Sequence, residues 1–351
     1  MMFLIWSIIL VLPTGLSAQT AQVGERSTVM IGARIDGRPF IWQDAVTKEY
    51  LGFFWDICTD AVTRAGYKFE AQQIDAATRK QFLETGEGIF DLLCDPTTIT
   101  LSRIKEFIDL NNGKRLRFSP IVFVANGSYV LSAQHPSTAG GFGQFDERIV
   151  GCAEAIAGEK KSTAPEPPEE SGFLQRLASR IPIQMLPPDN APASVENKYE
   201  IWGYVDGTTS KGIVDRAIKR SADQVTICPR PLATHAEAAR EFCAGRLARY
   251  YGDVEIVRAA IEEVPATGGT KCEADFKPTA GGSYEPYAFV VSGSRFRTLP
   301  EEFDHALYGM FSDGSIDRLF DGHFPDKRKS QFLNTLFRIN SLPPGTPQEQ
   351  P

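Results

Sequence analysis

The strongest constraint on the fold is an alternation of short apolar strands and amphipathic helices near the start of the chain. The apolar segment 27–35 precedes residues with the i, i+3, i+4 spacing of one helix face, namely Phe54, Ile57, Cys58, Ala61, Val62 and Ala65. Gly66 ends this predicted helix. A strand at 67–74, a helix at 78–85 and a strand at 89–94 complete a βαβαβ order. This order predicts an α/β fold with a mostly parallel sheet and helices on both faces.

The same alternation returns in the second half of the chain. Strands are expected at 200–205, 224–228 and 247–250, with helices that begin at Lys211 and His235. Two such stretches are enough for two lobes with separate cores.

The region between these stretches has a different character. The extended segment 118–131 suits a crossing from one lobe to the other. Residues 132–198 include a Pro- and Glu-rich run at 162–170, which is typical of a solvated loop, so we expect an insertion in the second lobe. The tail 344–351 is rich in Pro and Gln and is expected to be disordered.

The first 18 residues have the pattern of a signal peptide. An apolar stretch through Leu12 is followed by Pro13 and small residues that end at Ala18. The stretch is shorter than the roughly 20 residues that span a bilayer. We therefore expect cleavage and export to the periplasm, and an anchoring helix is the alternative.

Six cysteines form an even set, which in an exported protein predicts disulfides. Buried free thiols are the alternative. Cys58 and Cys94 fall in the same predicted lobe, so they are the pair we expect first.

Several classes of function are disfavoured. A net charge of -7 argues against a nucleic-acid partner. The four histidines show no i, i+4 pair, and the cysteines never form CxxC, so we expect no metal site. The segment 207–212 has the spacing of a P-loop, but Ile213 and Val214 replace the required Lys and Ser/Thr. No cofactor is expected.

Two turns have the chemistry of an anion site. Thr208 and Thr209 precede a predicted helix, where free amides and hydroxyls can hold an anion. Thr98 lies at the start of another helix, and Arg103 follows within it. The planar guanidinium of Arg suits a carboxylate because it donates two parallel hydrogen bonds. Ordinary helix caps and a surface Arg are the alternatives.

These segments occur in an order that carries a resemblance. The TxTxxR segment 98–103, with Phe118-Ser119 downstream, is its most specific part. The weaker parts are Pro39-Phe40, Gly52-Phe53, Asp91-Leu93, Gly207-Thr209, Tyr250-Asp253 and Glu285-Ala288. Together they resemble extracellular solute-binding proteins of family 3, the polar amino-acid receptors of ABC importers. The resemblance covers roughly residues 28–131 and 200–325.

The resemblance implies the type II periplasmic binding protein fold. In that fold two lobes are joined by two crossover hinge strands, and ligand is trapped between them by hinge closure. The first lobe is expected at 27–120 and 284–343, and the second at 121–283, with the insertion at 132–198.

The resemblance also implies roles for individual residues. Arg103, helped by Thr98, would clamp the α-carboxylate of the ligand, and Thr208 and Thr209 would contribute from the second lobe. Asp253 would accept the α-ammonium group, with a plain helix cap as the alternative.

Two departures from the family pattern bear on the ligand. Arg34 resembles the Arg of glutamate and aspartate receptors and predicts an acidic side chain on the ligand. An ion pair between Arg34 and Asp36 is the alternative. Gly37 stands where the family often has an aromatic residue over the ligand, which loosens the pocket.

The expected function is that of a monomeric periplasmic receptor, not an enzyme. It would deliver an amino acid or a related carboxylate to an ABC permease. One alternative is an exported enzyme resembling cyclohexadienyl dehydratase on the same fold, with Asp95 and Glu255 as further candidate acids. Another is a sensory or partner-binding module that docks through the insertion.

Overall fold

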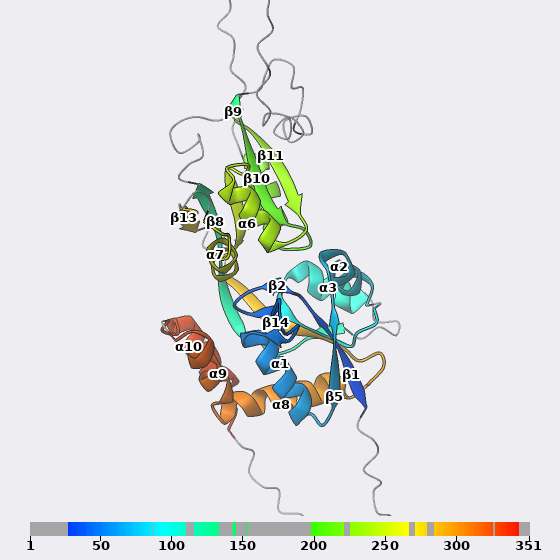
Figure 1. Ribbon diagram of the computed structural model, residues 1–351. Helices are drawn as coiled ribbons and strands as arrows, with labels where there is room; N and C mark the ends of the chain where they lie inside the picture. Colours follow the sequence, from blue (N-terminus) through cyan, green and yellow to red (C-terminus); the bar gives the residue numbers. More distant parts are fainter. Residues whose placement is uncertain are drawn as a thin grey trace, which may run out of the picture.

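The computed structural model describes residues 27–86, 88–109, 116–132, 143–144, 152, 198–220, 225–266, 271–278, 284–325 and 327–343. The predicted signal peptide, the tail and nearly all of the predicted insertion lie outside these residues. Within them, no helix has the length and apolar character needed to cross a membrane. Figure 1 shows two α/β lobes joined by a narrow waist.

The first lobe is built on the predicted βαβαβ order. β1 (Thr28–Ala33) lies between β5 (Lys68–Gln73) and β6 (Leu92–Thr98) and is parallel to both. Helix α1 (Phe53–Arg64) lies between β1 and β5 in the chain, and α2 (Ala76–Thr85) connects β5 to β6. The predicted parallel sheet is therefore confirmed.

The start of α1 depends on a glycine. Gly52 has a φ of 126°, and a Cβ at this position would lie 2.4 Å from the carbonyl oxygen of Phe40. Only glycine avoids both the strain and the clash. The turn places Phe53 and Phe54 at the start of the helix, where both are fully buried in the core of the first lobe.

The second lobe repeats this architecture. β10 (Lys198–Val205) lies between β11 (Val225–Leu232) and β12 (Arg249–Asp253) and is parallel to both. A two-residue strand, β9 (Gly143–Gln144), pairs with the start of β10. Separate apolar clusters form on this sheet. The helices of this lobe are α5 (Ser210–Arg220), α6 (His235–Cys243) and α7 (Val254–Glu262).

Two long strands connect the lobes. In β8 (Phe123–Ser132), residues 123–126 pair with β14 (Tyr284–Ser292), and residues 127–132 pair with strands of the second lobe. Beyond its pairing with β8, β14 continues into the first lobe beside β6. These are the two crossover strands of the type II periplasmic binding protein fold.

Several short elements were not predicted. β2 (Asp36–Gly37), β3 (Ile41–Gln43) and β4 (Tyr50–Leu51) form a small separate sheet that follows β1. β7 (Leu116–Phe118) pairs with β14, and β13 (Ala274–Pro278) pairs with β8.

The helices that complete the first lobe are α3 (Leu101–Asp109), α8 (Leu299–Ser312), α9 (Ser315–His323) and α10 (Gln331–Asn340).

All six cysteines form disulfides. Cys58 and Cys94, the pair expected first, join α1 to β6 within the first lobe. The other two disulfides are Cys152–Cys228 and Cys243–Cys272, and their cysteines lie in or pack against the apolar core of the second lobe. Because none of the three joins one lobe to the other, they leave the lobes free to move about the crossover strands.

Candidate functional site

The six residues predicted to bind ligand line one cavity between the lobes. Arg34, Thr98 and Arg103 line it from the first lobe, and Thr208, Thr209 and Asp253 line it from the second. The cavity lies at the carboxyl ends of β1, β6, β10 and β12, which is where α/β sheets bind ligands.

The lobes are close together around this cavity. Its volume is about 50 Å³. That space holds only a few water molecules, since each needs about 10–15 Å³ of such volume. An amino acid can enter only if the lobes or the lining side chains move apart.

Among the residues that the structure describes, Arg103 is the cation of the cavity without a carboxylate partner. Its Nη1 donates to the carbonyl oxygen of Thr98 at 2.7 Å, and the part of the chain that the structure describes offers it no ion pair. Burial, together with the nearby guanidinium of Arg79, lowers the pKa of Arg103 to about 10. An anion bound beside Arg103 would offset this unfavourable environment.

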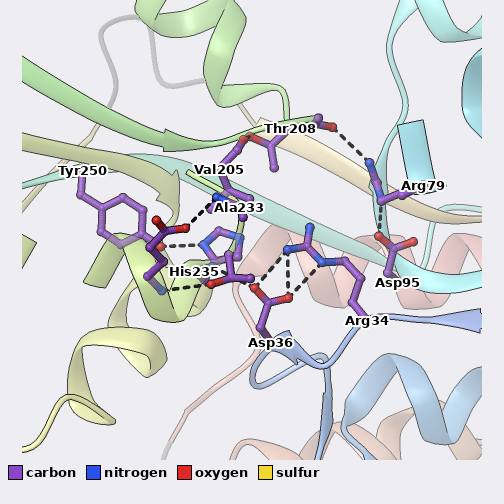
Figure 2. Close-up of polar contacts among 12 residues, drawn as sticks. Arg34, Asp36, Arg79, Asp95, Val205, Thr208, Ala233, His235 and Tyr250 are labelled. Carbon is purple, nitrogen blue, oxygen red and sulfur yellow. Dashed lines mark hydrogen bonds and ion pairs between the residues drawn. The ribbon is translucent and has the colours of Figure 1, made fainter. Parts of the chain in front are cut away.

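Arg79 is a second buried guanidinium, which the sequence did not reveal. It lies in α2 with a relative exposure of 5% and forms an ion pair with Asp95, which is 1% exposed (Figure 2). Arg79 also donates to the hydroxyl of Thr97 at 3.0 Å and to the carbonyl oxygen of Gly207 at 3.2 Å. The contact with Gly207 crosses from the first lobe to the second. Arg79 therefore supports the site and links the lobes.

Glu285 is the other residue that sequence reasoning missed. Its Oε2 accepts the hydroxyl of Thr98 at 2.7 Å and the hydroxyl of Thr209 at 2.8 Å. One donor comes from each lobe, and both were predicted to bind ligand. Thr208 also lines the cavity, but its hydroxyl donates to the carbonyl oxygen of Val205 at 2.7 Å, just before α5 (Figure 2).

Asp253 has the geometry of a helix cap. Its Oδ1 accepts the N–H groups of Glu255 and Ile256 at 2.6 and 3.2 Å, at the start of α7. Its Oδ2 accepts the hydroxyl of Tyr287 at 3.1 Å. Burial outweighs these hydrogen bonds and raises the pKa of Asp253 to about 7. The cap left open as an alternative is therefore present, and the carboxyl group also lines the cavity.

Arg34 forms the ion pair that was left open as the alternative to ligand binding. Its Nε and Nη2 approach Oδ1 of Asp36 at 3.1 and 2.9 Å, and Nη2 lies 3.2 Å from Oδ2 (Figure 2). Burial by itself raises the pKa of Asp36, but the Arg34 guanidinium and the contact with His235 give a net lowering. The ionised carboxylate neutralises Arg34.

His235 connects this pair to the second lobe. Its backbone N–H donates to Oδ2 of Asp36 at 2.8 Å, and its Nδ1 lies 2.6 Å from the hydroxyl of Tyr250. Burial lowers the pKa of His235 to about 4, so the ring is neutral at pH 7. The attraction to Asp36 therefore comes from the N-terminus of α6 and not from a charged imidazole.

A second and larger cavity lies between the lobes next to the first. Its volume is about 450 Å³, and Arg34 lines both cavities. Residues 75–77 line it from the first lobe, and Asp206 with residues 231–234 lines it from the second.

The chain is similar to proteins of one family and to solved structures of one fold. The model of the bacterial extracellular solute-binding proteins, family 3, matches residues 29–326. No curated protein matches the sequence.

Solved structures with this fold are distant in sequence. An ancestral arginine-binding protein bound to glutamine is 19% identical, with a TM-score of 0.54 over 86% of this chain and 100% of that one. The arginine-, lysine-, histidine-binding protein ArtJ from Geobacillus stearothermophilus is 13% identical, with a TM-score of 0.55 over 88% and 100%. The ancestral amino acid-binding protein AncCDT-1, a precursor of cyclohexadienyl dehydratase, is 18% identical, with a TM-score of 0.52 over 85% and 95%.

Proposed function

The chain belongs to the bacterial extracellular solute-binding proteins, family 3, and on this basis we propose that it captures a small amino acid or related carboxylate between its lobes. The observation that carries the proposal is one cavity lined by all six predicted residues, with Arg103, which has no ion-pair partner among the described residues, in its wall. In the proposed complex Arg103 binds the carboxylate of the ligand through its planar guanidinium.

The proposal requires the lobes to separate for ligand entry. Four hydrogen bonds that cross between the lobes near the cavity would break on opening: Arg79 to Gly207, Thr209 to Glu285, His235 to Asp36, and Tyr287 to Asp253. Each of these bonds is replaced by bonds to water on opening, so its net contribution is only about 2 kcal/mol even with a charged partner. Such a small difference suits a receptor that opens and recloses about β8 and β14. The predicted lobe boundaries, 27–120 with 284–343 and 121–283, are part of this proposal.

The proposed ligand is an amino acid or related carboxylate without a specified side chain. Solved relatives of this fold include proteins bound to glutamine, to L-arginine and to histidine. An acidic side chain, predicted from Arg34, is not part of the proposal because Asp36 already neutralises that guanidinium. The larger cavity beyond Arg34 offers room for a longer side chain.

The proposed setting is that of an importer receptor. The protein is exported after removal of residues 1–18, acts as a monomer and delivers its ligand to an ABC permease. Relatives of the same fold include the substrate-binding protein of an amino acid ABC transporter. Catalysis is not part of this role.

One observation favours a second candidate function. Asp253 is buried in the cavity wall and has a pKa of about 7, which is the range of a general acid at neutral pH. Together with the similarity to AncCDT-1, this supports an elimination from a cyclohexadienyl substrate as the alternative. Incubation with prephenate tests it: a steady loss of prephenate that Asp253→Asn abolishes would favour the enzyme, and a flat trace would exclude it.

A thermal-shift screen of the purified mature protein tests the proposed function. The panel is L-arginine, L-glutamine, L-glutamate, L-aspartate, L-histidine and glutarate. Because a ligand that binds only the native state stabilises it, at least one compound should raise the Tm by several degrees. Arg103→Ala should remove the shift. No shift with any compound would contradict the proposal.

A further inference from the structure

The charged groups of the cavity can be sorted by their partners. Two guanidiniums are already neutralised, because Arg34 pairs with Asp36 and Arg79 pairs with Asp95. Both pairs lie within one lobe and persist whether the lobes are open or closed. They leave no net charge for a ligand to balance.

Among the described residues, one cation and two carboxyl groups of the cavity remain, namely Arg103, Glu285 and Asp253. Arg103 and Glu285 both line it, and neither has an ion-pair partner within 4.0 Å in the part of the chain that the structure describes. The hydroxyls of Thr98 and Thr209 both donate to Oε2 of Glu285. No described residue donates to Oε1, so this oxygen can still accept a hydrogen bond.

Asp253, the acid that the family resemblance assigned to the ammonium group, is in a different state. Both of its oxygens already accept hydrogen bonds, Oδ1 from two backbone N–H groups and Oδ2 from Tyr287. It has no cationic partner among the described residues, and burial places its pKa near 7. A carboxyl group that is partly protonated at neutral pH is a poor acceptor for an ammonium ion.

We propose that Glu285, on the crossover strand β14, accepts the α-ammonium group of the ligand. The ligand is then a zwitterion whose carboxylate binds Arg103 and whose ammonium group binds Oε1 of Glu285. This inference rests on the proposed function and deepens it, because it specifies the class of carboxylate that the site selects.

The position of Glu285 also links recognition to closure. Thr98 belongs to the first lobe and Thr209 to the second, so the carboxylate is held by both hydroxyls only when the lobes are together. An opened protein keeps only the bond from Thr98. The ammonium site is therefore complete only in the closed form, which favours amino acids over simple carboxylates at the closing step.

Isothermal titration calorimetry with matched ligand pairs tests the inference. The amino acids are L-arginine, L-glutamine and L-glutamate, each paired with the analogue that lacks the α-ammonium group: 5-guanidinopentanoate, glutaramate and glutarate. The proteins are the wild type, Glu285→Gln and Asp253→Asn, each at pH 7.5. Gln keeps an oxygen that can accept the two threonine hydroxyls but removes the charge.

Wild-type protein should bind at least one amino acid far more tightly than its analogue. Glu285→Gln should lower the affinity for that amino acid about 100-fold, as expected for the loss of a desolvated charge partner. Its affinity for the analogue should stay within about threefold, since one carboxylate contact is unchanged. Asp253→Asn should lower the amino acid affinity less than about fivefold, because Asn still caps the helix.

Glu285→Asp guards against a folding defect in the Gln variant. It keeps the charge but withdraws it by one methylene, so it should retain more amino acid affinity than Glu285→Gln. A large loss in Asp253→Asn with none in Glu285→Gln would overturn the inference. So would wild-type protein that binds an analogue as tightly as its amino acid. Wild-type protein that binds none of the six compounds would instead contradict the proposed function.

Discussion

Asp36 of the first lobe caps a helix of the second lobe, because its Oδ2 accepts the backbone N–H of His235 at 2.8 Å. His235 is the first residue of α6, so the carboxylate faces the positive end of that helix. The same carboxylate neutralises Arg34. A single side chain therefore stabilises both a buried cation and the contact between the lobes.

Replacement of Asp36 should destabilise the protein and open it. Asp36→Ala leaves the guanidinium of Arg34, whose side chain is 9% exposed, without its partner. Breaking a buried pair in this way costs about 3 kcal/mol of unfolding free energy. Urea denaturation measures this loss, and small-angle X-ray scattering should show a larger radius of gyration for the ligand-free variant.

The control is an exposed ion pair in a helix. Asp215 pairs with Lys211 at 2.7 Å, and both side chains are more than 40% exposed. Asp215→Ala should cost no more than about 0.5 kcal/mol and leave the radius of gyration unchanged. Equal effects of the two substitutions would contradict the role assigned to Asp36.

Asp253 predicts a pH dependence of stability with a defined sign. Burial raises its pKa to about 7 in the native protein, from the ordinary value of 3.8 for an exposed Asp. Between these values the native carboxyl group keeps a proton that the unfolded chain has lost. The contribution of Asp253 to the unfolding free energy therefore falls as the pH rises through this window, by up to about 1.4 kcal/mol per pH unit.

The measurement compares wild type with Asp253→Asn by urea denaturation from pH 4.5 to pH 8. The comparison is needed because His235 acts in the opposite direction: burial lowers its pKa to about 4, so its contribution rises with pH between about 4 and 6.5. His235 is present in both proteins and cancels in the difference. Wild type should lose stability relative to the variant as the pH rises, and a constant difference would show that Asp253 is not buried as described.

The Cys58–Cys94 disulfide should contribute to stability and not to ligand binding. Both residues are fully buried, and they are separated by 36 positions in the chain. Closing a loop of this length in the unfolded chain is worth about 3–4 kcal/mol. The double substitution Cys58→Ala with Cys94→Ala should lower the unfolding free energy by about this amount. Since the disulfide lies within one lobe, ligand affinity should change little.

Thiol titration of the unfolded wild type, without reductant, provides the control. All six cysteines are paired, so no thiol should react. Reactive thiols in the unreduced chain, or a double variant as stable as wild type, would contradict the disulfide assignment.

The sequence predicted the regular part of the fold because the signal there is periodic. The apolar face of α1 and the short apolar strands around it follow the helix and strand repeats over many residues. Each candidate ligand residue follows or ends a parallel strand, or lies within a few residues of such an end, so the fold itself brings them together. The elements that were missed are mostly too short to show a period, as in the strands β2, β3 and β4.

The internal partners of the site were harder to predict. Arg79 lies in a helix whose polar and apolar residues are weakly separated, so nothing in the sequence shows that it faces inward. Glu285 had a usable signal. It stands two positions before Tyr287 in β14, so the two side chains lie on the same face of that strand, and both line the cavity. Pairing of Arg34 with Asp36 depends on the turn after β1, which the sequence left open.

Isothermal titration calorimetry on Arg103→Lys is the most direct test of the central claim. The variant keeps a positive charge but loses the planar pair of donors that binds a carboxylate, and Arg258→Lys on α7, where Arg258 lies over Phe276, serves as the control. With the amino acid that binds wild type most tightly, Arg103→Lys should lose affinity about 100-fold, and the control should match wild type. Equal affinity of wild type and Arg103→Lys would contradict capture of a carboxylate between the lobes.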